Sequence, residues 1–128
     1  MATITEDYVS FETAKLLKEK GFDEPCAWLY DNQGRKEYVS AYHLPWPNSE
    51  LEEDEWSCCT LQMAMKWLRE VHNRFIEICT DRAHNFKYIV FRPAIYDKEL
   101  DCLWESDNFS TYEQACEAAI KYCLENLI

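Results

Sequence analysis

The chain has 128 residues, of which 48% are hydrophobic and 15% aromatic, with two glycines, four prolines and a formal net charge of −11. This composition excludes a disordered or fibrous chain and fits a single domain spanning residues 1–128. The negative charge disfavours direct binding to nucleic acid or to anionic lipid. No apolar run approaches the roughly 20 residues that cross a bilayer, and the acidic start does not resemble a signal peptide.

The cysteines number seven, which is an odd count without the spacing of a disulfide framework. Several fall on predicted apolar faces, where a thiol behaves as a small hydrophobic group. We therefore expect reduced thiols and a cytoplasmic protein. The seven residues are Cys26, Cys58, Cys59, Cys79, Cys102, Cys116 and Cys123.

The first third of the chain predicts a helix followed by a hairpin. Ser10 can cap a helix that runs to Lys20, and Gly21 is typical of a left-handed stop. Two segments rich in aromatic and β-branched residues, Cys26–Tyr30 and Glu37–Tyr42, flank a turn-forming stretch that contains an asparagine and a glycine. These features predict two antiparallel strands joined by a turn longer than two residues.

The segment His43–Ser57 predicts an irregular loop, because it contains two prolines and then five acidic residues without a basic one. Charge is uneven along the chain. Residues 1–59 hold 13 acidic and 5 basic residues, which gives −8, whereas residues 60–92 hold 3 and 6, which gives +3. Residues 93–128 hold 8 and 2, which gives −6.

The rest of the chain predicts two more helices and further strands. Thr60 can cap a helix through His72, with Asn73 as its stop, and Ser110 opens a capping-box pattern for a last helix that ends near Asn126. Strands are predicted between these helices, at Phe75–Cys79, at Tyr88–Phe91 with Ile95 and Tyr96, and at Cys102–Trp104.

The element order is therefore α-β-β-α-β-β-(β)-α. Hairpins imply antiparallel pairing rather than the crossover connections of parallel sheets. The sequence thus predicts an α+β fold in which three helices pack on a single antiparallel sheet of four or five strands.

Three stretches, Tyr8–Cys26, Thr60–Asn73 and Thr111–Ile128, carry a resemblance that covers a large share of the chain. In these stretches the chain resembles small uncharacterised proteins encoded by bacteriophages and mobile elements of Bacteroides-type gut bacteria. The resemblance implies a bacterial or phage cytoplasm. It implies no catalytic residue and no cofactor.

Trp46 is the first candidate binding residue, since it stands between two prolines and close to Tyr42 and His43. Aromatic side chains often dominate the energy of protein interfaces, and prolines keep their surroundings extended. The alternative is a tryptophan that folds back on the core.

Cys58 and Cys59 are the candidate reactive thiols, because they precede a predicted helix N-terminus, which lowers a thiol pKa. His43 or His72 could act as base. The structural alternative is a pair of buried cysteines near acidic neighbours. These two cysteines do not have the spacing of zinc ligands, and the acidic run lacks the pattern of a calcium loop, so no metal site is predicted.

The function that these features favour is that of a non-enzymatic accessory protein, acting by contact with another protein or by self-association. One alternative is an acidic mimic of nucleic acid that inhibits a host protein. Others are a thiol-dependent enzyme and a small-molecule binder with a pocket lined by Trp28, Tyr30 and Tyr38. No phosphate-binding loop, dinucleotide-binding turn, nucleophile elbow or metal-binding helix is present.

Overall fold

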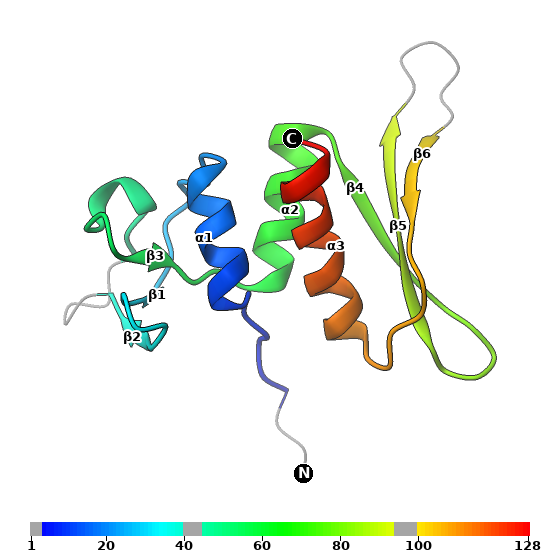
Figure 1. The fold of residues 1–128 in the computed structure, drawn as a ribbon, viewed down its shortest axis with the longest axis horizontal. Coiled ribbons are helices and arrows are strands. Elements are labelled where there is room, and N and C mark those ends of the chain that lie inside the picture. The colour runs from blue at the N-terminus through cyan, green and yellow to red at the C-terminus, as the bar shows by residue number, and fades with distance from the viewer. Residues whose placement is uncertain (1–3, 40–44, 94–99) are drawn as a thin grey trace. The chain divides into compact units, whose positions relative to one another are not determined.

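The structure is a computed structural model that describes residues 4–39, 45–93 and 100–128. These residues form an α+β fold with three α-helices and two separate three-stranded antiparallel sheets (Figure 1). Contacts divide the chain into two compact units, Met1–Leu61 and Gln62–Ile128. Among the described helices, none is both long and apolar enough to cross a membrane. The prediction of one domain over residues 1–128 stays a prediction.

The first unit begins with the predicted helix, α1 (Phe11–Glu19). Ser10 caps it, because its side-chain oxygen accepts a hydrogen bond from the N–H of Thr13 at 3.2 Å. Gly21 has a φ of 91°, which is the left-handed stop expected. The elements that follow are β1 (Trp28–Tyr30), β2 (Lys36–Tyr38), the short 3₁₀ helix η1 (Asn48–Glu50) and β3 (Trp56–Ser57).

The second unit contains α2 (Leu61–His72), which ends as predicted at Asn73, a residue with a left-handed φ of 57°. The last helix, α3 (Tyr112–Asn126), packs on the sheet, where Tyr122 stacks on Trp104 with ring centroids 4.8 Å apart. Its cap is Thr111, one residue after the predicted cap. The remaining elements of this unit are β4 (Phe75–Thr80), β5 (Phe86–Pro93), β6 (Leu100–Glu105) and α3 itself (Tyr112–Asn126).

The predicted single sheet of four or five strands is wrong, because each hairpin completes a sheet of its own. The strand order is β2-β1-β3 in the first unit and β4-β5-β6 in the second. β3 lies inside the segment that was expected to be an irregular loop, and it pairs with β1 opposite β2. β1 and β5 therefore have hydrogen-bonded partners on both sides, and neither is open to a strand of the other hairpin.

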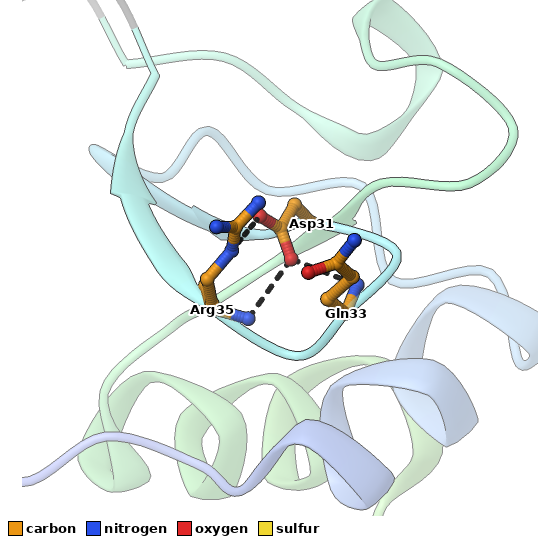
Figure 2. Close-up of polar contacts among 3 residues, drawn as sticks. All are labelled: Asp31, Gln33 and Arg35. Atoms are coloured by element: carbon orange, nitrogen blue, oxygen red, sulfur yellow. Dashed lines mark hydrogen bonds and ion pairs between the residues drawn. The ribbon is translucent and has the colours of Figure 1, made fainter.

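The turn between β1 and β2 fixes which residues face each other across the hairpin (Figure 2). Asp31 Oδ1 accepts hydrogen bonds from the backbone N–H groups of Gln33 at 2.8 Å and Arg35 at 2.9 Å. Arg35 Nε also donates to Asp31 Oδ2 at 2.9 Å. This turn closes the hairpin in the register that sets Trp28 opposite Tyr38.

Candidate interaction surface

The backbone of Trp46 pairs with that of Cys26, two residues before β1. Its N–H donates to the carbonyl of Cys26 at 3.0 Å, and its own carbonyl accepts from the N–H of Cys26 at 2.9 Å. The side chain remains 41% exposed. The other two predicted binding residues, Tyr42 and His43, lie outside the described residues. Trp46 is therefore an exposed aromatic residue on an ordered backbone.

Two further aromatic residues belong to the same unit as Trp46. Cys26, which pairs with Trp46, precedes Trp28 by two residues in the chain, and Trp28 and Tyr38 are cross-strand partners, which share one face of the sheet. Trp46 is the partner of Cys26 and Tyr38 is the partner of Trp28. The rings of Trp28 and Tyr38 meet edge to face at 4.5 Å, and Tyr38 is 48% exposed. We call Trp28, Tyr38 and Trp46 the aromatic face.

A lysine lies against the same face. The Lys36 ammonium is 3.5 Å from the ring centroid of Tyr8 and 4.9 Å from that of Trp28. Both distances fall within the range of a cation–π interaction. The backbone of Tyr8 forms a bridge with Thr60, the residue that precedes α2. Tyr8 and Trp28 together form what we call the cation cradle.

A second aromatic group joins α1 to the sheet. Phe11 contacts the rings of Tyr30 at 5.5 Å and Trp56 at 5.3 Å, and the Lys15 ammonium lies 4.3 Å from the Phe11 ring centroid. Gly34 comes so close to Phe11 that an added Cβ would lie 2.7 Å from Phe11 Cδ2. This close packing indicates that the second group is part of the structural framework.

The acidic segment, Glu50–Glu55, follows Trp46 and is held in place by hydrogen bonds to its backbone. The Lys18 ammonium donates to the carbonyls of Glu52 at 2.9 Å and Glu55 at 2.6 Å. The buried Asn48 donates to the carbonyl of Phe22 at 2.7 Å and accepts from the N–H of Ser57 at 2.9 Å. The segment is thus more regular than the loop that the sequence predicts, and its exposed carboxylates stand on an ordered backbone.

Comparison with protein-family models, with curated proteins and with solved structures finds no match.

Cys58 and Cys59, the candidate reactive thiols, are only 1% and 3% exposed. Burial and the neighbouring Cys58 raise the pKa of a third thiol, Cys26, to about 12. Of the two candidate bases, His43 lies outside the described residues and His72 belongs to the other unit. This environment disfavours a thiolate, which needs nearby positive charge and access to solvent.

His72 lies at the end of α2, in the second unit. Burial, followed by the nearby Arg74 guanidinium, lowers its pKa, and its ring meets the Trp67 ring at 4.6 Å. Its Nε2 atom is buried without a hydrogen-bond partner. Within the described residues, no group of three or more histidine, cysteine or acidic side chains is arranged to hold a metal ion.

The sequence predicted neither the cation cradle nor the pairing of Trp28 with Tyr38. The pairing could have been predicted, because the alternation of Trp28 and Tyr30 mirrors that of Lys36 and Tyr38 around the turn. Tyr8 gave no such signal. It lies 20 positions before Trp28, and its backbone pairs with the residue that precedes α2.

Proposed function

We propose that this chain is a non-enzymatic accessory protein of a bacteriophage or mobile element, which acts by contact with another protein through the aromatic face. The observation that carries the proposal is the exposure of Trp46 and Tyr38, at 41% and 48%, on hydrogen-bonded backbone within one unit. Exposed aromatic residues on an ordered backbone lose little conformational entropy when a partner covers them. A protein partner or a second copy of the chain fits this surface.

The proposed location is the cytoplasm of a bacterial host. The resemblance of Tyr8–Cys26, Thr60–Asn73 and Thr111–Ile128 to phage and mobile-element proteins supports it. All seven cysteines carry thiols, which fits a reducing compartment. The net charge of −11 favours a protein partner over direct contact with nucleic acid or an anionic membrane.

Affinity capture from a lysate of a Bacteroides-type host tests the proposal. The tagged wild-type chain should retain a stoichiometric partner, or a second copy of itself, and Trp46→Ala should lose it. Trp104→Ala is the matched control, because Trp104 is 43% exposed but belongs to the second sheet. Thermal melting of each variant separates loss of binding from loss of the fold.

Equal capture by the wild-type chain and Trp46→Ala would refute the role of the aromatic face. A Trp46→Ala chain that unfolds would instead indicate that Trp46 is a structural residue. In that case Tyr38→Ala provides the second test, since Tyr38 lies on the edge strand β2 and is the more exposed of the two residues.

A second candidate function is mimicry of nucleic acid by the acidic segment. The observation that favours it is that Lys18 and Asn48 hold the segment's backbone in place while Glu50, Glu52 and Glu53 remain exposed. An acidic mimic binds the basic groove of its target, so capture should weaken steeply as salt rises. Capture through the aromatic face should instead depend on Trp46 at every salt concentration.

The two remaining alternatives have less support. A thiol-dependent enzyme needs an accessible thiolate, whereas Cys58 and Cys59 are buried. A small-molecule pocket lined by Trp28, Tyr30 and Tyr38 would use side chains that already contact other rings, since Trp28 meets Tyr38 at 4.5 Å and Tyr30 meets Phe11 at 5.5 Å.

A further inference from the structure

We infer that Tyr8 and Trp28 form a binding site for a basic side chain of the partner, and that Lys36 of this chain occupies the site until the partner arrives. This inference rests on the proposed function, because it names the chemistry of one contact within the same surface. The ligand class is an arginine or lysine side chain in a positively charged protein segment.

The position of Lys36 indicates where a cation binds. Its ammonium lies 3.5 Å from the ring centroid of Tyr8 and 4.9 Å from the ring centroid of Trp28. The face of each ring carries partial negative charge, and tryptophan and tyrosine are the strongest aromatic partners for cations. A second cation of similar size can therefore make the same contacts once Lys36 moves away.

Both rings stand on backbone that is already fixed. Trp28 belongs to the central strand β1, and its ring meets that of Tyr38 edge to face. Backbone hydrogen bonds hold the residues on either side of Tyr8, with Val9 N–H donating to Cys59 at 3.0 Å and Asp7 accepting from Leu61 at 2.9 Å. Binding therefore requires no ordering of the site, which favours affinity.

Lys36 can leave the cradle at little cost. All three residues of β2 are exposed, and β2 is an edge strand. An exposed cation–π contact is weak, and a lysine side chain has many alternative rotamers in water. An arginine from a partner would add a flat guanidinium that stacks on an aromatic ring.

The charge of the surrounding unit favours a cationic ligand. Residues 1–59 carry 13 acidic and 5 basic residues, a net charge of −8, and the exposed carboxylates of the acidic segment belong to the same unit. This field attracts a positively charged segment before contact is made. An acidic or neutral ligand would gain nothing from it.

Tetramethylammonium is a suitable probe, because it contains a quaternary ammonium ion that binds aromatic faces and donates no hydrogen bonds. NMR titration would follow the indole N–H of Trp28 and the ring protons of Tyr8, against sodium chloride at equal ionic strength. Lys36→Ala should bind the probe on the order of threefold more tightly than the wild-type chain, because the internal competitor is gone. Adding Tyr8→Leu to Lys36→Ala should abolish the gain.

Lys15→Ala is the matched control. It removes a lysine that lies 4.3 Å from a different aromatic ring, that of Phe11, and should leave the titration unchanged. The inference is overturned if Lys36→Ala and Lys15→Ala bind alike, or if Tyr8→Leu leaves binding intact. N-acetyl-arginine amide, titrated in the same way, should compete with tetramethylammonium, and failure to compete would exclude an arginine ligand.

The outcome is separable from the proposed function. If the cradle binds no cation while Trp46→Ala still abolishes capture, the aromatic face acts through apolar contact and only this inference fails. If the cradle binds cations but capture does not depend on Trp46, the proposed role of the aromatic face fails instead.

Discussion

Asp31 and Asp81 build the same turn in two different hairpins. Each aspartate accepts backbone hydrogen bonds through Oδ1 from the residues two and four positions later, at 2.8 and 2.9 Å for Asp31 and at 2.9 Å for both bonds of Asp81. Each also has the residue three positions later in the left-handed region, with φ of 78° at Gly34 and 62° at His84. The two sheets thus use one turn design although their strands differ.

The first prediction concerns the acid stability of these turns. Backbone hydrogen bonds lower the pKa of both Asp31 and Asp81 below the ordinary value of 3.8. A carboxylate with a depressed folded-state pKa stabilises the fold above pH 3.8, and this contribution is lost as pH falls through the folded-state pKa. Asp31→Asn and Asp81→Asn should each lower Tm at pH 7. In each variant, Tm should also decrease less steeply below pH 4 than it does in the wild-type chain. A fall in Tm as steep as that of the wild-type chain would contradict this account.

The second prediction compares the left-handed positions of the two turns. His84 bears a conformational cost that glycine avoids, so His84→Gly should raise the free energy of unfolding by up to about 1 kcal/mol. Gly34→Ala should have the opposite effect, because alanine is strained at this φ and its Cβ would meet Phe11. Urea unfolding of both variants tests the pair. Two variants that are both destabilised would show that the histidine side chain has a role of its own.

Helix ends were predictable because their signals are local. Ser10 and Asn73 act within one turn of the helix that each bounds, and both were identified from sequence. The sequence did not predict β3, because two residues are too few to display the alternation of a strand. Trp56 pairs with the edge of β1 that β2 leaves open. The contact of Lys36 with Tyr8 joins segments far apart in the chain, so no window of sequence contains it.

The third prediction concerns Asn48, which is 5% exposed and links the carbonyl of Phe22 to the N–H of Ser57. Asn48→Ala removes both hydrogen bonds and leaves the Phe22 carbonyl and the Ser57 N–H unsatisfied. The expected loss is about 2 to 4 kcal/mol in the free energy of unfolding. Asn32→Ala, in the exposed turn between β1 and β2, should change the free energy of unfolding by less than about 0.5 kcal/mol. Equal effects in urea unfolding would refute the bridging role of Asn48.

The fourth prediction concerns His72, whose pKa is lowered by burial and then by Arg74. The unfolded chain, with a histidine pKa near 6.5, binds the proton more readily than the folded chain does. The stabilising contribution of neutral His72 is therefore complete above pH 6.5 and declines as pH falls from 6.5 toward the folded-state pKa. His72→Phe keeps a ring against Trp67 and should reduce this decline. Urea unfolding at about pH 5 and pH 7.5 measures the decline in the free energy of unfolding. A decline that His72→Phe leaves unchanged would come from other titratable groups.

The fifth prediction concerns the thiols. Cys102 is exposed, whereas Cys58 and Cys59 are buried, so iodoacetamide should label Cys102 first under native conditions. The two buried thiols should react more slowly by on the order of tenfold or more, because their labelling requires local opening of the fold. Mass spectrometry of the peptides gives each rate, and labelling in urea, where every thiol is accessible, provides the control. If Cys58 or Cys59 reacted as fast as Cys102 in the folded protein, its thiol would be reachable from solvent, and thiol chemistry would again compete with protein contact as the function.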